Sequence, residues 1–207
     1  MTATSERPRS TPPAEVTGPA VRGSAFIEPV RHVKAAIGVD GLTRVARDGG
    51  PAVADALATP LRKLGWYSYG TYVDFLQAID RRLGKGDLAY GRTLGEAAGR
   101  RDLGTVFRIY AALASPERLI RGCAKVWESY YREAGSMEAT AWAPEETVLV
   151  VRDFRAMHPV HCRLMEGWMI ATMENIGYVV EPGSRETKCM SRGHDVHEFT
   201  ARWRKAK

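Results

Sequence analysis

The chain has 207 residues, of which 44% are hydrophobic and 26% are charged, and this composition excludes wholesale disorder. The formal net charge is +6, but the basic residues are scattered, apart from one short run from Arg202 to Lys207. Without a basic stripe interleaved with aromatic residues, no nucleic-acid partner is predicted. Three cysteines argue against a disulfide framework, and no apolar stretch suits a membrane span or a signal peptide. The expected location is therefore the cytoplasm.

Residues 1–24 are rich in proline, serine, threonine and alanine and show no apolar period, so they are predicted to form a disordered leader. A single domain is expected over residues 25–204. Its first part, 25–135, is predicted to be helical, and its second part, 136–204, is predicted to contain a sheet.

Apolar residues recur at helical spacing throughout the first part. The predicted helices are 30–37, 39–46, 52–64, 71–83, 88–99 and 103–113. Gly38 separates the first two of these helices. The clearest helix begins at Ser115, which is an N-cap residue followed by Pro116 at the first helical position, and it ends at Gly135.

The period changes after Gly135. Residues 137–141 alternate between apolar and polar, a turn follows at 144–146, and 147–151 is β-branched and apolar, which predicts a β-hairpin. A helix is predicted over 157–176. The last strands are expected at 178–180, 187–189 and 196–203. The predicted fold class is therefore α+β, with a helical N-terminal half followed by ββαββ and a mainly antiparallel sheet.

From near Arg118 onwards, an ordered set of residues carries a resemblance. The set is His161-Cys162, Glu166-Gly167-Trp168, Asn175-Ile176-Gly177, Glu186-Thr187-Lys188-Cys189, Gly193, His197, Phe199 and Trp203. It resembles the 4-vinyl-reductase-type small-molecule-binding domain, in the ligand-binding superfamily of NO-signalling and Golgi-transport (TRAPP-like) proteins. The resemblance implies a non-enzymatic sensor or adaptor domain that binds a small apolar or aromatic ligand or a signalling protein partner. It also implies a homodimer.

Some members of that family bind zinc, and their ligand positions correspond to Cys162, Glu186, Cys189 and His197. The resemblance thus implies a zinc site in which His197 replaces a cysteine, a change that zinc tolerates. A set of four protein ligands leaves no open position, so this zinc would be structural. Substitute ligands stand nearby at His194 and Asp195. Taken singly, each ligand also suits an ordinary buried or solvated position.

Related sensor domains hold an aromatic ligand between helices and sheet. The residues expected to line such a site here are Trp127, Tyr130, Trp142, His158, His161 and Trp168. Tryptophan and histidine add a polar group to an apolar wall, which suits a phenol-like ligand. The alternative is that these aromatic residues fill the core, and Met165, Met169 and Met173 are interpreted as packing.

Two other functions remain as alternatives. The first is a haem-based gas sensor in which His158 or His161 binds the iron. Haem is not expected, because Tyr67-Ser68-Tyr69 does not reproduce the Tyr-x-Ser-x-Arg signature of that branch. The second is a tetrapyrrole- or aromatic-modifying enzyme. The sequence contains no Gly-rich dinucleotide loop and no diagnostic catalytic constellation, so no catalytic residue is assigned.

Overall fold

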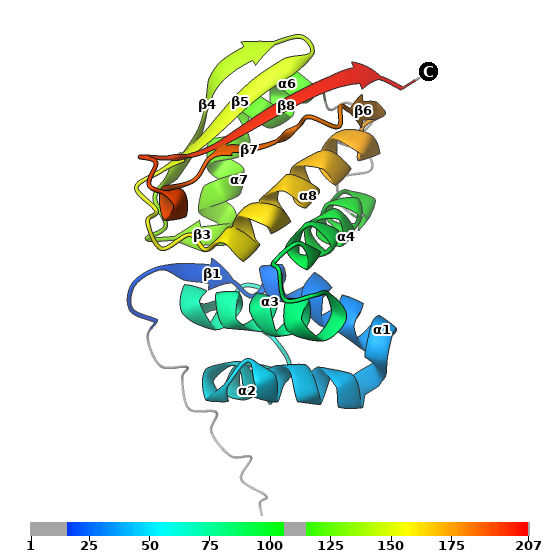
Figure 1. Ribbon diagram of the computed structural model, residues 1–207, viewed down its shortest axis with the longest axis vertical. Helices are drawn as coiled ribbons and strands as arrows, with labels where there is room; N and C mark the ends of the chain where they lie inside the picture. Colours follow the sequence, from blue (N-terminus) through cyan, green and yellow to red (C-terminus); the bar gives the residue numbers. More distant parts are fainter. Residues whose placement is uncertain (1–15, 106–114, 207) are drawn as a thin grey trace, which may run out of the picture.

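A computed structural model describes residues 16–105 and 115–206 of the chain. Helices α1 to α3 lie at one end, the larger sheet lies at the other, and α4 and α8 lie between them (Figure 1). The helices of the first half are α1 (Ser24–Asp48), α2 (Pro51–Leu57), α3 (Tyr69–Leu83) and α4 (Tyr90–Thr105). Those of the second half are α6 (Pro116–Arg121), α7 (Cys123–Tyr130), α8 (Pro159–Asn175) and the short 3-10 turn η1 (Met190–Arg192). Part of the helix predicted over 103–113 lies outside the described residues.

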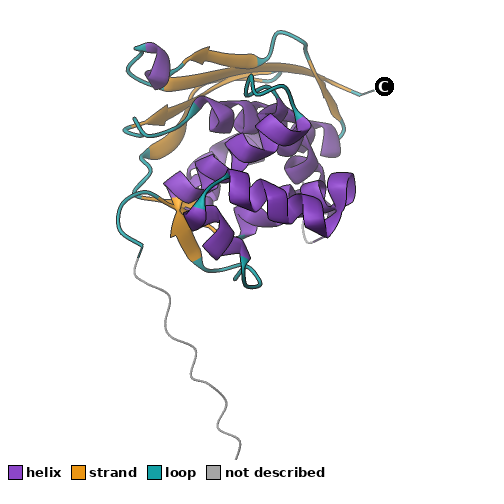
Figure 2. Ribbon diagram, turned by 60° about the horizontal axis from the view of Figure 1, so that its bottom comes forward, coloured by secondary structure: helices purple, strands orange, loops and turns teal. Residues whose placement is uncertain are grey.

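The larger sheet has the strand order β4-β5-β8-β6, and β7 also pairs with β8. Its strands are β4 (Ser136–Ala143), β5 (Glu146–Arg152), β6 (Tyr178–Val180), β7 (Arg185–Lys188) and β8 (His197–Lys205). Every pairing in it is antiparallel. Figure 2 shows this sheet as a layer along one side of the helices. The predicted α+β fold class, with a helical first half and a mainly antiparallel sheet, is confirmed.

A second, smaller sheet joins distant parts of the chain in the order β2-β1-β3. Its strands are β1 (Ala20–Arg22), β2 (Trp66–Ser68) and β3 (Tyr131–Arg132). Strand β1 falls within residues 1–24, where the sequence predicts a disordered leader. A three-residue strand whose partners are far away in the sequence shows no apolar period of its own, so tertiary pairing sets its structure.

Helix α1 combines two predicted helices into one kinked element. Ile37 and Gly38 leave the helical conformation, and Gly38 has φ of +74°. Glycine adopts this left-handed region without the steric cost that other residues incur. The expected break at Gly38 is therefore present as a kink.

Helices α4 and α8 pack unusually closely through glycines. A Cβ atom added to Gly95 would collide with the carbonyl oxygen of Leu164, and one added to Gly167 would collide with that of Arg92. Small residues at these positions let the two backbones approach each other. One side of α8 is thereby fixed against α4, and its other side faces α7 and the sheet.

Among the described residues, no helix combines the length and the apolar character that a membrane crossing requires.

Candidate functional site

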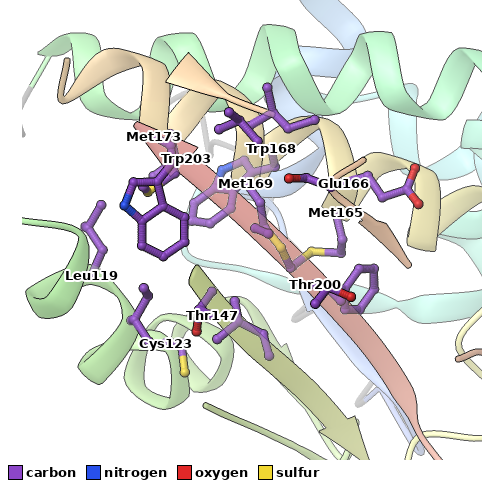
Figure 3. Close-up of a pocket in the computed structure, with 18 of the residues that line it drawn as sticks. Leu119, Cys123, Thr147, Met165, Glu166, Trp168, Met169, Met173, Thr200 and Trp203 are labelled. Carbon is purple, nitrogen blue, oxygen red and sulfur yellow. The ribbon is translucent and has the colours of Figure 1, made fainter. Parts of the chain in front are cut away.

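An apolar cavity of about 100 Å³ lies between α6, α7, α8 and the inner face of the sheet (Figure 3). Leu119 and Cys123 contribute to its wall from α6 and α7, Met169 and Met173 from α8, and Phe199 from β8. An apolar cavity of this kind is a favourable environment for an apolar ligand. This space is called the larger cavity below.

A neighbouring space of about 60 Å³, the smaller cavity, lies between the N-terminal helices and α7 and α8. Its lining includes Tyr72, Trp127 and Tyr131. The two cavities share the lining residues Val126, Met137, Met165 and Trp168. Methionine side chains adapt readily, so the partition that Met137 and Met165 form can move more easily than a partition of branched residues.

Most polar groups in the wall of the larger cavity have protein partners. The Thr147 hydroxyl donates to the carbonyl oxygen of Ala141 at 2.9 Å, and the Ser184 hydroxyl donates to that of Arg202 at 3.3 Å. The Thr172 hydroxyl differs. It is buried on α8, lines the same cavity and has no hydrogen-bond partner among the described residues.

Cys123 opens α7 and lines the larger cavity. Burial raises the pKa of its thiol above the ordinary value, and the nearby Glu138 carboxylate also raises this pKa. The side chain is therefore a neutral thiol at neutral pH. Its sulfur is a soft donor in a mainly apolar wall.

The structure brings the four predicted metal ligands together. The ligand atoms of Cys162, Glu186, Cys189 and His197 all lie within 4.8 Å of one another, and all four residues are buried. His197 Nδ1 lies 3.0 Å from a Glu186 oxygen and 3.4 Å from the Cys162 sulfur. Two thiols, an imidazole and a carboxylate form a donor set that suits a tetrahedral metal ion.

Further polar groups orient this four-residue cluster. Arg192 pairs with the second Glu186 oxygen at 3.1 Å, and the Ser191 hydroxyl lies 3.0 Å from the Cys189 sulfur. Burial, together with the Glu186 carboxylate, raises the pKa of the Cys162 thiol far above its ordinary value. In the protein alone Cys162 is therefore protonated, and a metal ion must displace that proton to bind the sulfur.

His161 lies at the junction of the two halves of the molecule. Its Nδ1 is 3.0 Å from the Tyr69 hydroxyl of α3, and its Nε2 is 2.7 Å from the Tyr131 hydroxyl of β3. Burial, followed by the neighbouring histidines His197 and His158, lowers the pKa of His161 to about 3. The ring is neutral, and both of its nitrogens are engaged.

The six residues predicted to line a ligand site do not surround one cavity. Trp127, Tyr130 and Trp168 line the smaller cavity, and Trp168 also lines the larger one. The other three, His161, His158 and Trp142, line neither cavity. His158 caps α8, whereas Trp142 lies on β4 with 39% of its surface exposed and packs against the indole of Trp203.

Sequence reasoning missed Cys123 and Thr172 and assigned the methionine ridge to packing. The available signal was the helical spacing of Met165, Met169, Thr172 and Met173, which places a hydroxyl in an apolar stripe of α8. That spacing alone does not separate a filled core from a cavity.

No protein-family model matches the sequence, and no curated protein matches it. Solved structures of H-NOX proteins are similar to the chain. An H-NOX protein from S. oneidensis in the Fe(II) ligation state superposes with a TM-score of 0.70 and 13% identity, over 90% of this chain and 97% of that chain. Unliganded Fe(II) H-NOX from K. algicida superposes with a TM-score of 0.65 and 13% identity, over 89% of this chain and 97% of that chain. An S. oneidensis H-NOX protein in the Fe(II)NO state superposes with a TM-score of 0.61 and 15% identity, over 88% of this chain and 99% of that chain.

These structures correct the resemblance to 4-vinyl-reductase-type and TRAPP-like domains, which is wrong. The residues behind that resemblance lie in the second half of the chain, whereas the H-NOX similarity spans about nine tenths of the chain and includes the helical half. At such low sequence identity, the similarity establishes the fold.

The expected function and cofactor are corrected as well. The main interpretation, a non-haem sensor with a zinc cofactor and no haem, is contradicted by neighbours described in Fe(II), Fe(II)NO and Fe(II)CO states. Another similar structure concerns the redox potential of haem and distortion of its porphyrin. The alternative interpretation, a haem-based gas sensor, agrees better with these neighbours.

Proposed function

We propose that this chain is a haem-based gas sensor domain built on the H-NOX fold. Two features support the proposal. The fold is that of proteins described with Fe(II) and with NO and CO bound to it. The observation that carries it in this chain is a sulfur donor, Cys123, in the wall of an apolar cavity between helices and sheet.

The donor set determines how a haem would be held. No histidine lines either cavity in the described part of the chain, and His161 has both ring nitrogens engaged. Haem iron also accepts a cysteine thiolate as its axial ligand. Cys123, and not His158 or His161, is thus the described donor that would hold a haem iron, but its neutral thiol and a cavity of about 100 Å³ do not fit the group as they stand.

The remaining contacts would come from the cavity wall. Arg185 borders the larger cavity and suits a haem carboxylate, because arginine pairs strongly with carboxylates. The larger and smaller cavities are separate, so accommodating a macrocycle requires the side chains of Met137 and Met165 to move. A bound haem would supply an iron that takes up a diatomic gas. The chain would supply the Cys123 sulfur and the apolar wall that excludes water.

Absorption spectroscopy tests this proposal. We expect the purified or haem-reconstituted protein to show a Soret band, and Cys123→Ser to lose it or shift it. Cys162→Ser is the matched control, because Cys162 lines neither cavity and should leave the band unchanged. A protein without a Soret band after reconstitution would refute the proposed function.

We further propose that Cys162, Glu186, Cys189 and His197 hold one divalent metal ion. The convergence of four buried donors within 4.8 Å supports this. Such an ion would join α8 to β7, η1 and β8 and would add its binding free energy to folding. We expect Co²⁺ to bind with a ratio of one per chain and to give thiolate charge-transfer absorption. Cys189→Ser should weaken both the Co²⁺ binding and the charge-transfer absorption, whereas Cys123→Ser should weaken neither. A wild-type protein that takes up no Co²⁺ would contradict the site.

A homodimer, a signalling protein partner and a cytoplasmic location stay predictions. Val39 and Leu64 are exposed at 66% and 76% on the helical half and are the first positions at which to seek a protein contact. Sedimentation velocity tests the dimer directly, and a monomer throughout the micromolar range would contradict it.

A further inference from the structure

One face of the smaller sheet carries two arginines around a half-buried tryptophan. Arg22 of β1 lies opposite Trp66 of β2, and Ala20, two residues before Arg22, lies opposite Arg132 of β3. Residues opposite each other, or two apart on one strand, point to the same side of a sheet, so Arg22, Trp66 and Arg132 share one face. The two guanidinium carbons lie 3.9 Å and 4.9 Å from the centroid of the indole ring. None of the three residues lines the larger or the smaller cavity.

The loop before β2 adds two cations and an exposed leucine to this face. The side chains of Arg62 and Lys63 are exposed, and Leu64 is 76% exposed. The loop is held in place by its backbone, since the N–H of Ser24 donates to the Lys63 carbonyl oxygen at 3.0 Å. The Arg22 guanidinium donates to the Leu64 carbonyl oxygen at 3.0 Å, which joins the loop to the face of the sheet.

These residues are called the basic patch below: Arg22, Arg62, Lys63, Leu64, Trp66 and Arg132. In the described part of the chain, none of the four cations of the patch forms an ion pair with a carboxylate. The sequence contains no acidic residue between Asp55 and Asp74, and Glu133, which follows Arg132, does not pair with it. The fold therefore gathers like charges that an anionic partner would neutralise.

We infer that the basic patch binds the surface of an anionic phospholipid bilayer. Lysine and arginine are attracted to acidic headgroups, and tryptophan suits the level of the headgroups. Leu64 favours a bilayer over an acidic protein segment or a nucleic acid, because its side chain would leave water for the acyl chains, which a solvated polyanion does not offer. A bilayer also needs no groove. This inference does not depend on the proposed haem-based function.

Cosedimentation of the full chain with vesicles tests the inference. We expect binding to vesicles with about 30% phosphatidylserine, no binding to phosphatidylcholine alone, and release at about 0.5 M salt, which screens the attraction. Lys63→Glu replaces one attraction by a repulsion, so the partition constant should fall about thirtyfold. The matched control is Lys205→Glu, in the basic run at the other end of the chain, which makes the same change in net charge and should alter binding less than about twofold.

Leu64→Ser tests the apolar contribution and should weaken binding about tenfold. Its control is Val39→Ser, since Val39 is 66% exposed but has no lysine or arginine within three residues. Equal losses for the two lysine variants would overturn the inference, because binding would then follow net charge alone. A wild-type protein that binds polyglutamate but not the anionic vesicles would overturn it in favour of an acidic protein segment. Neither result bears on the gas-sensor function, which the Soret band tests separately.

Discussion

His158 begins α8 as its N-cap, and this role depends on its protonation state. Its Nδ1 accepts the backbone N–H of Val160 at 3.2 Å, which a ring protonated at that atom cannot do. Burial lowers the pKa of His158 below its ordinary value of 6.5. The unfolded chain therefore binds a proton more readily than the folded chain. The contribution of the neutral His158 cap to the free energy of unfolding is complete above pH 6.5 and is lost as the pH falls through the folded-state pKa.

We expect His158→Asn to make the free energy of unfolding less dependent on pH below pH 6.5. Asparagine caps a helix as well as histidine does, but it does not titrate. Urea denaturation at about pH 7.5 and about pH 5 measures the effect. Parallel losses of stability in the wild type and the variant would contradict this role of His158.

Cys123 should give haem binding a distinct pH dependence. Burial raises the pKa of its thiol, and a coordinating sulfur must lose its proton. Haem affinity should therefore rise about tenfold per pH unit below that pKa. Cys123→Met, whose thioether carries no proton, should bind haem with little dependence on pH. Competition titrations at several pH values measure both affinities, and equal slopes would count against coordination by Cys123.

The sequence predicted the donor cluster better than it predicted the cavity. The family resemblance, and not the apolar period, implied the set Cys162, Glu186, Cys189 and His197, and the structure brings these four donors together from α8, β7, the residue before η1 and β8. Cavities arise from the mismatch between packed side chains, which periodicity does not encode. For this reason the sequence analysis assigned Trp142 and Trp127 to the same ligand site on the basis of residue type alone, although the two lie in different parts of the fold.

At the level of elements, most helices and the main hairpin followed from apolar period and capping residues. The helix predicted from Ser115 to Gly135 is wrong in its extent, since it is divided into α6 and α7 and gives way to β3 at Tyr131, and the helix predicted over 52–64 ends at Leu57. The pairing of β1 with β2 and β3 could not be predicted in this way, because contacts between residues distant in sequence determine where these short strands form. The close packing of α4 against α8 was also missed. Gly91, Gly95 and Gly99 are spaced at intervals of four on one helix face, a signal that becomes informative only when the opposing backbone is known.

Gly95→Ala tests that helix contact. The added methyl group would collide with the Leu164 carbonyl of α8, so the helices must separate. We expect a loss of about 1–3 kcal/mol in the free energy of unfolding, as for other overpacked interiors. Gly183→Ala is a control, since an added Cβ there meets no atom within 4 Å. Equal stability of the two variants by urea denaturation would refute the close approach.

At the scale of the whole molecule, a buried polar link connects the helical half to the sheet-containing half. Tyr69 of α3 and Tyr131 of β3 bond the two nitrogens of His161, and the indole of Trp127 lies parallel to the imidazole. Tyr131 and Trp127 also line the smaller cavity. A ligand that displaces either residue would disturb this link, so occupancy of the cavity can alter how the halves are held together.

A double-mutant cycle on Tyr131→Phe and His161→Gln measures the strength of the link. Each single change removes one side of a 2.7 Å hydrogen bond and leaves its partner buried. The partner then loses a bond without regaining water, so each single variant should unfold about 1–3 kcal/mol more easily. The double variant should be less destabilised than the sum of the two by about 1 kcal/mol, because the bond is lost only once. Strict additivity would show that Tyr131 and His161 do not act as a unit, and that the halves are held together by apolar packing instead.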